Sequence, residues 1–188
     1  YDFEVNGGGS ERKISIAQAL EFEKWDIITV QQVSSLSGMY ETYEPYLSEL
    51  VKYVKENQPS ALLYIHRTWS YEIDTSHSGF ANYDKDQARM FKEICKATEL
   101  ACLTTGASLI KSGDVIQKMR EAERNAIMEE YGDKQDEMLI GTVALEDVDN
   151  YFIDIGRING ILPKKECIPG EKIEMGKQIK VYVSKVDN

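Results

Sequence analysis

Several features that would place this 188-residue chain in a specialised class of protein are missing from its sequence. No run of about 18 apolar residues occurs, so we expect no transmembrane helix and no membrane partner. The first residues lack a basic segment followed by an apolar one, so they predict no secretory signal peptide. Cysteine is scarce: the three cysteines have no spacing typical of a disulfide framework or a metal site. These absences predict a cytoplasmic protein in a reducing compartment.

Patterns typical of cofactor binding are missing as well. The two histidines, His66 and His77, have no partner ligand at helical spacing, so we expect no metal. The glycines at 7–9 are not followed by Lys-Ser or Lys-Thr, which argues against a phosphate-binding loop. The formal net charge of −10 disfavours strong nonspecific binding to DNA but leaves room for a local basic patch. The sequence therefore predicts no cofactor.

Over the first two-thirds of the chain, short apolar runs alternate with segments of helical periodicity. The runs are rich in β-branched residues and predict buried parallel strands, while apolar stripes predict helices between them. The predicted order is strand 25–32, helix 41–57, strand 61–69, helix 84–106 and strand 107–113. Asp84 can cap the second helix, with Gln87 as its reciprocal partner. This alternation predicts right-handed crossovers and a parallel sheet covered on both faces.

After about residue 136 the pattern changes to strands alone. Apolar runs at 138–146, 150–156, 160–163 and 177–186 are separated by Asp, Asn and Gly turns. Short strands with glycine at the corners predict a small closed barrel of five strands, of the OB type. The chain is therefore expected to hold three parts: an α/β domain at 1–114, a connecting helix at 115–134 and an all-β barrel at 135–188.

Five short motifs in the last third occur in a fixed order: REAERN, DIGR, ILPKKE, IPGE and IKVYV. In this order and spacing, residues 115–188 resemble the NusA family of bacterial transcription factors. The resemblance implies a connecting helix followed by an RNA-binding OB domain that acts in transcription elongation, termination and antitermination. It implies single-stranded RNA as a partner, and RNA polymerase as a partner of the parent of this part. The polymerase-binding and KH domains of that family are not present in the sequence.

An OB barrel binds single-stranded nucleic acid by stacking bases on aromatic rings and by holding phosphates with cations. Tyr151 and Phe152 are neighbours on one predicted strand, so one faces outward and the other inward. The resemblance places the aromatic at Phe152 on the RNA face, with core packing as the alternative. The candidates for phosphate contacts are Arg157, Lys164 and Lys165, with Lys177 and Lys180 as further candidates.

One position departs from the RNA-binding pattern. Pro163 stands where many related domains carry a second stacking aromatic or a histidine. Lys164 and Lys165 follow it directly, and for these two a solvated loop is the alternative interpretation. The departure predicts weak rather than tight binding of RNA.

The motifs WDIITVQQVS, TWSY and FANYDKDQ lie in the first two-thirds of the chain. Over about residues 14–119 they resemble a bacterial family of SGNH-hydrolase-like domains. The resemblance implies a flavodoxin-like α/β fold of three layers with a parallel sheet. It also implies serine esterase chemistry, with a Ser nucleophile, a His base and an orienting Asp. Substrates of such an enzyme would be acetylated carbohydrates or small esters.

The sequence supplies no intact SGNH triad. Gln31, Gln32 and Ser34 stand where the oxyanion motif of the family would lie. His77 follows a predicted strand, and Asp74 could orient it. An improvised triad with Ser34, Ser35 or Ser37 as the nucleophile is therefore an alternative. His66, inside a strand, is expected to be structural. The first strand of the family fold is not recognisable, so the strand at 25–32 is expected to leave an apolar edge open.

The two resemblances overlap at about Val115–Arg120, as a joint between two bacterial fragments would. We therefore hypothesise a chimera: an RNA-binding module of NusA type joined to a truncated, inactive hydrolase-like domain. The alternative is an SGNH-type esterase or acetyl-hydrolase. A complete triad would separate these two hypotheses.

Overall fold

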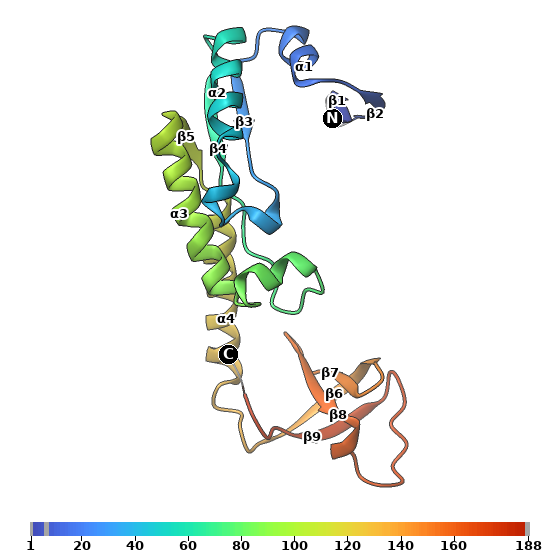
Figure 1. The fold of residues 1–188 in the computed structure, drawn as a ribbon. Coiled ribbons are helices and arrows are strands. Elements are labelled where there is room, and N and C mark those ends of the chain that lie inside the picture. Colours follow the sequence, from blue (N-terminus) through green and yellow to red (C-terminus); the bar gives the residue numbers. More distant parts are fainter. Residues whose placement is uncertain (1, 6–7, 187–188) are drawn as a thin grey trace. The chain divides into compact units, whose positions relative to one another are not determined.

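The computed structural model describes residues 2–5 and 8–186, which divide into two compact units between Gln117 and Lys118 (Figure 1). We call them the α/β unit and the β unit. Helix α4 (Ser112–Tyr131) crosses this boundary, so its first turns belong to the α/β unit and the rest to the β unit. Within the part of the chain that the structure describes, no helix is long and apolar enough to span a membrane.

The α/β unit is built around a parallel sheet with the strand order β3-β4-β5. A separate antiparallel pair, β1 and β2, precedes it and forms a sheet of its own, so β3 is an edge strand. The strands and helices are β1 (Asp2–Val5), β2 (Gly8–Lys13), α1 (Ile16–Phe22), β3 (Ile27–Val30), α2 (Tyr46–Asn57), β4 (Leu62–His66), α3 (Gln87–Thr105) and β5 (Ser108–Ile110). Short 3-10 helices η1 (Ser34–Leu36), η2 (Tyr40–Thr42) and η3 (Ser78–Tyr83) lie in the loops.

Both long helices of this unit begin later than predicted. The helix predicted at 41–57 is interrupted by Pro45, which has no N–H to donate, so η2 comes first and α2 starts at Tyr46. The predicted cap at Asp84 is wrong, because Asp84 has a left-handed backbone with φ of 54°. Asp86 caps α3 instead, and its carboxylate accepts from the Arg89 N–H at 2.9 Å.

Helices cover one face of the parallel sheet rather than the two faces of a three-layer fold. α2 packs through Val51 and Val54, and α3 through Ala97 and Ala101. Both helices contact the buried side chains of Leu63 and Ile65 on β4. Because the strands follow in sequence order, both right-handed crossovers lie on the same side. The opposite face carries exposed apolar side chains, with Ile27 at 54% and Leu62 at 59% exposure.

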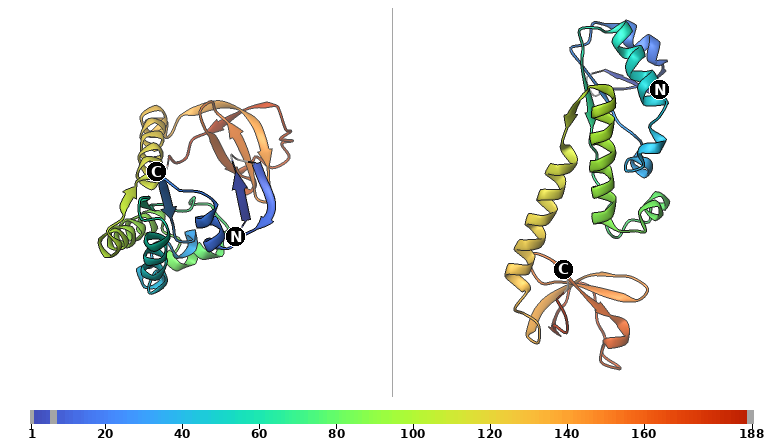
Figure 2. Two further views of the ribbon diagram at one scale, coloured as in Figure 1. Left: turned by 90° about the horizontal axis from the view of Figure 1, so that it is seen from above. Right: turned by 60° about the vertical axis from the view of Figure 1, so that its left-hand side comes forward.

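The β unit holds one antiparallel sheet with the order β8-β7-β6-β9, which curls into a half-barrel (Figure 2). Its strands are β6 (Met138–Glu146), β7 (Asn150–Asp154), β8 (Asn159–Pro163) and β9 (Gln178–Tyr182). Residues 164–177 form η4 (Lys164–Glu166) and turns instead of a strand, so the predicted five-stranded closure is not found in the described residues. Gly141 permits the curl, because a Cβ there would lie 2.5 Å from the Ile153 side chain.

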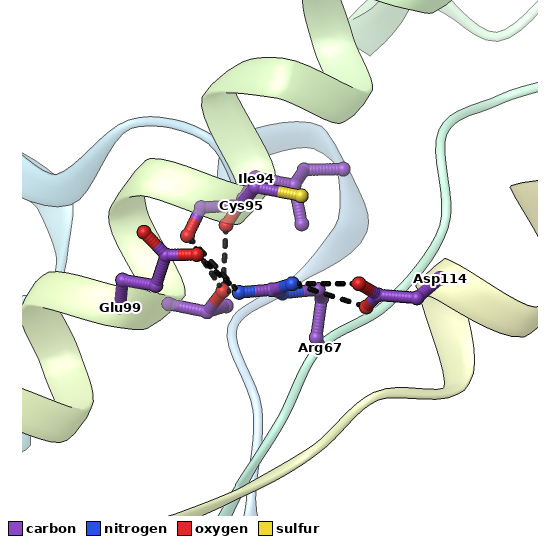
Figure 3. A network of polar contacts seen from close by, with 6 residues as sticks. Arg67, Ile94, Cys95, Glu99 and Asp114 are labelled. Carbon is purple, nitrogen blue, oxygen red and sulfur yellow. Dashed lines mark hydrogen bonds and ion pairs between the residues drawn. The ribbon is translucent and has the colours of Figure 1, made fainter.

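A buried arginine joins three elements of the α/β unit (Figure 3). Arg67, directly after β4, is 3% exposed. Its guanidinium donates two bonds of 3.0 Å to the Asp114 carboxylate on α4 and one of 3.0 Å to Glu99 on α3. The Nε atom donates to the Thr98 hydroxyl at 2.9 Å, and Nη2 donates to the Cys95 carbonyl at 3.4 Å. We call this group the Arg67 clamp.

Pairing keeps the Arg67 guanidinium charged. Burial alone would lower its pKa, but the neighbouring Cys95 and the carboxylates of Asp114 and Glu99 outweigh burial and raise the pKa. A buried charge without such partners would be strongly destabilising. The clamp therefore ties the start of α4 to the end of β4.

Gly113 lets the first turn of α4 approach the end of β4 closely. Its N–H donates to the Arg67 carbonyl at 3.0 Å. A Cβ at this position would lie 2.1 Å from the Thr68 carbonyl oxygen, which no side chain can accommodate. The first turn of α4 is thus held against β4 by backbone and side-chain contacts together.

Two buried tyrosines hold the loop between β3 and α2. The Tyr43 hydroxyl donates to the Ser37 carbonyl at 2.7 Å. The Tyr83 hydroxyl donates to the Ser35 carbonyl at 3.2 Å and accepts from the Gly38 N–H at 2.9 Å. Burial raises the pKa of both hydroxyls, and the proximity of Tyr83 raises that of Tyr43 further.

We expect Asp114→Ala to lower the free energy of unfolding of the α/β unit by about 3 kcal/mol, because it leaves a buried guanidinium short of its bidentate partner. The matched control is Glu99→Ala. The Glu99 side chain is 63% exposed, so its loss should cost about 1 kcal/mol or less. Urea denaturation followed by tryptophan fluorescence measures both, since Trp25 and Trp69 lie in this unit. Equal losses in the two variants would contradict the bidentate role of Asp114.

We also expect the free energy of unfolding to fall as the pH rises above about 10, by up to about 1.4 kcal/mol per pH unit for each buried tyrosine. The folded state holds the protons of Tyr43 and Tyr83 more tightly than the unfolded chain, because both pKa values are raised. Their contribution to stability is therefore complete below the ordinary tyrosine pKa of about 10 and is lost as the pH rises above it. Urea denaturation between pH 8 and 11 tests this. Tyr43→Phe should reduce the slope of the free energy of unfolding against pH. An unchanged slope would contradict the role of the Tyr43 hydroxyl.

Candidate functional sites

Three side chains meet at the carboxyl edge of the parallel sheet. His66 is the last residue of β4, Gln31 follows β3, and Ser112 follows β5 and opens α4. The His66 Nδ1 atom lies 2.6 Å from Gln31 Oε1, and its Nε2 atom lies 2.9 Å from Ser112 Oγ. All three come from the ends of parallel strands, where α/β folds gather functional side chains.

The partners of His66 define which ring nitrogen carries the proton. The amide oxygen of Gln31 only accepts, so Nδ1 is the donor in the neutral ring. Nε2 is then left with a lone pair that accepts the Ser112 hydroxyl proton. This is the arrangement in which a histidine acts as a general base toward a serine.

A cavity of about 210 Å³ shares one residue, Gln31, with this group. Its walls are mainly apolar and include Val30, Leu47 and Ile65, together with Tyr43 from the turn before α2. Gln31 lines the cavity and also accepts from His66, so it belongs to both. The cavity can take a small apolar group beside Gln31.

The residues predicted for the oxyanion motif have different roles in the structure. Gln31 contacts His66, whereas Gln32 donates from Nε2 to the Thr42 carbonyl at 3.2 Å and so fixes the loop. Ser34 begins η1, and its carbonyl accepts from the Ser37 hydroxyl at 2.8 Å. Of these three, only Gln31 meets a histidine within the described residues.

The structure shows no hydrogen-bonded triad of Ser34, Asp74 and His77 within residues 2–5 and 8–186. Asp74 is exposed. His77 caps η3, since its Nδ1 accepts from the Gly79 N–H at 3.0 Å. Its ring stacks on that of Tyr71, with 4.7 Å between the ring centres.

Sequence reasoning missed Ser112 and favoured a structural role for His66. The available signal was positional, since both residues end or follow strands whose carboxyl ends meet at one edge. No group of three or more metal-binding side chains is found in the described part of the chain.

In the β unit, the register of the sheet separates two faces. Val143 and Ile153 pair across β6 and β7 and are buried at 1% and 2% exposure, so they mark the inner face. Phe152 pairs with Leu145 and Ile161 and lies on the other side. Leu145 and Ile161 are 56% and 66% exposed. We call the surface formed by Ile140, Leu145, Phe152, Ile161 and Lys180 the outer face.

Tyr151 and Lys164 lie together but are not free of partners. The Lys164 ammonium lies 5.1 Å from the centre of the Tyr151 ring and forms an ion pair of 2.6 Å with Glu146. The hydrogen bond to the Glu146 carboxylate raises the pKa of Lys164. The charge of this lysine is therefore already paired with a carboxylate of the same sheet.

Arg157 contacts the helix of its own unit. Its guanidinium pairs with Glu123 at 3.2 Å and Glu130 at 3.6 Å, both on α4. The Tyr131 hydroxyl donates to the Ile155 carbonyl and accepts from the Arg157 N–H, each at 3.2 Å. Arg157 thus fixes α4 to the half-barrel, whereas Lys165 is exposed in η4 and has no ion pair among the described residues.

Part of the chain is similar to transcription factors. It is 44% identical over 72 residues to the transcription termination/antitermination protein NusA of Thermus thermophilus, and 36% identical over 73 residues to that of Bacillus subtilis. These alignments cover 38% and 39% of this chain but only about a fifth of the relatives, 19% and 20%. The chain thus spans a small part of those proteins.

A solved structure is similar to more of the chain. A DUF4886 family protein from Bacteroides uniformis shares 41% identity with a TM-score of 0.56, over 60% of this chain and 44% of that one. A second, a candidate SGNH hydrolase from Slackia heliotrinireducens, shares 23% identity with a TM-score of 0.40 over 50% of this chain and 49% of that one, too distant to support an argument.

The family model described as a domain of unknown function, DUF4886, matches residues 4–136. An alignment of 72 residues cannot fit within 137–188, so the NusA similarity overlaps this match. The family match covers more than half of the sequence, and the chain therefore belongs to the DUF4886 family.

Proposed function

We propose that the β unit binds single-stranded RNA through the outer face. The observation that supports this most directly is the row Leu145–Phe152–Ile161, which presents an aromatic ring between two exposed apolar side chains. Such a row on a curled antiparallel sheet offers a stacking platform for unpaired bases. The similarity to NusA supports a role in transcription for this part, with RNA polymerase as a further proposed partner.

The cations of the β unit indicate that binding is weak and depends mainly on stacking. Lys164 pairs with Glu146, and Arg157 pairs with Glu123 and Glu130. Lys165 and Lys180 are exposed and make no ion pair in the part of the chain that the structure describes. Lys180 lies opposite Ile140 on the outer face. Of the five cations predicted to contact phosphate, these two therefore provide a modest electrostatic contribution.

For the α/β unit we propose no activity through the SGNH pattern of Ser34, Asp74 and His77. Asp74 is exposed and His77 is used to cap η3. We further propose that the chain joins a DUF4886 segment to a NusA-like segment through α4. The overlap of the two similarities supports this joint.

Replacing Phe152 should weaken RNA binding at least tenfold. Phe152→Ala removes a ring whose stacking on one base is worth about 1–3 kcal/mol. Phe152→Leu keeps the apolar volume but not the ring, so it should lose nearly as much. Fluorescence anisotropy with a labelled 12-nucleotide RNA at low salt measures the dissociation constants. Ile168→Ala, at an exposed position away from the strands, is the control. Wild-type affinity in Phe152→Ala would refute the stacking role.

The salt dependence of RNA binding should be shallow. With two phosphate contacts, from Lys165 and Lys180, the logarithm of the association constant should fall with the logarithm of salt concentration with a slope of about −1.4. Lys165→Ala should reduce the magnitude by about 0.7. Lys177→Ala is the matched control, because Lys177 already pairs with Glu174. A slope several times steeper would show that the paired cations also contact RNA.

A further inference from the structure

We propose that Ser112, His66 and Gln31 form a nucleophilic centre in the α/β unit that cleaves short acyl esters. This activity is separate from RNA binding and does not use the residues of the SGNH pattern. It also revises the expectation that the unit is inactive, which rested on the incomplete triad.

The backbone places Ser112 as a nucleophile requires. β5 ends at Ile110 and α4 begins at Ser112, so the serine stands on a short strand-to-helix turn. Such a turn exposes a hydroxyl at the carboxyl edge of a sheet. Ser112 is half-buried, and its Oγ lies 2.9 Å from the His66 ring. A strand end and a helix start thus present one hydroxyl to one base.

The Arg67 clamp positions this serine. Asp114, two residues after Ser112, receives two hydrogen bonds from the arginine next to His66. The Gly113 N–H binds the Arg67 carbonyl at 3.0 Å. Ser112 and His66 are therefore each followed in sequence by residues that join the same two segments. Arg67 and Asp114 are positioning residues, since neither touches the reacting atoms.

The reaction is balanced without any further reactant than water. Ser112 Oγ bonds to the ester carbonyl carbon while its proton moves to His66 Nε2. The carbon–oxygen bond to the alcohol breaks, and the alcohol leaves with that proton. Water then attacks the acyl-serine with His66 again as base, which releases the acid and restores the hydroxyl.

Gln31 serves as the third member of the group. Its amide oxygen holds Nδ1–H at 2.6 Å and so fixes the tautomer. An amide carries no charge, so it stabilises the imidazolium less than a carboxylate does. We infer a slow hydrolase. We assign a short, apolar acyl group to the substrate, since the cavity that Gln31 also lines holds about 210 Å³ and has mainly apolar walls.

The first experiment uses the intact wild-type chain and an alkyl phosphonofluoridate. Attack by Ser112 Oγ forms a phosphorus–oxygen bond and expels fluoride, and His66 takes the proton. Peptide mass spectrometry then gives the labelling rate of each serine. Ser112 should react at least about tenfold faster than Ser48, an exposed serine of α2 without an imidazole partner. Equal or slower labelling of Ser112, or labelling of a different serine alone, would overturn the proposal.

The second experiment tests the assigned roles in hydrolysis of p-nitrophenyl acetate. Ser112→Ala and His66→Gln should both abolish turnover, while Ser48→Ala should leave it unchanged. Gln31→Glu should increase turnover at least about tenfold, because a carboxylate in this place stabilises the imidazolium. A gain of activity cannot come from misfolding. No gain in Gln31→Glu, with thermal unfolding unchanged, would refute the triad geometry. RNA affinity measured on the same samples keeps the two proposals apart.

Discussion

The fold and the candidate centre of the α/β unit both depend on one buried charge. Arg67 is almost fully enclosed, so its guanidinium must be paired, and the pairs come from α3 and from the first turn of α4. That requirement fixes where α4 starts relative to β4. Ser112 and His66 lie beside the paired residues in sequence, so their contact follows from the same constraint. A structural ion pair thereby determines a chemical arrangement.

The sequence predicted elements better than their packing. Hydrophobic periodicity located β3, β4, β5 and both long helices, because burial imposes that periodicity directly. It could not show that α2 and α3 share one face, since this depends on the order of strands in the sheet. The Asp84 cap was wrong because two acidic residues compete there, and only local backbone angles distinguish them. The contact of Ser112 with His66 joins residues 46 apart in sequence, and no local pattern encodes it.

Helix α4 offers a physical basis for the proposed joint between the two segments. Its first turn contacts the Arg67 clamp through Asp114. Its later turns contact the half-barrel through Tyr131 and through the ion pair of Glu123 with Arg157. A helix with separate contacts at its two ends can satisfy two different neighbours without changing its own backbone. Exposed positions between them, such as Met119, carry little structural constraint. This is where sequences from two sources can join at low cost in stability.

The one-sided coverage of the parallel sheet has a practical consequence. Ile27 and Leu62 lie side by side on the uncovered face, and among the described residues β3 pairs on one side only, with β4. Adjacent apolar side chains and a free strand edge favour contacts between molecules when they are crowded. Concentration therefore becomes a variable in its own right for this chain. Light scattering at several dilutions would measure association between molecules, and dilute samples would contain the largest share of single molecules.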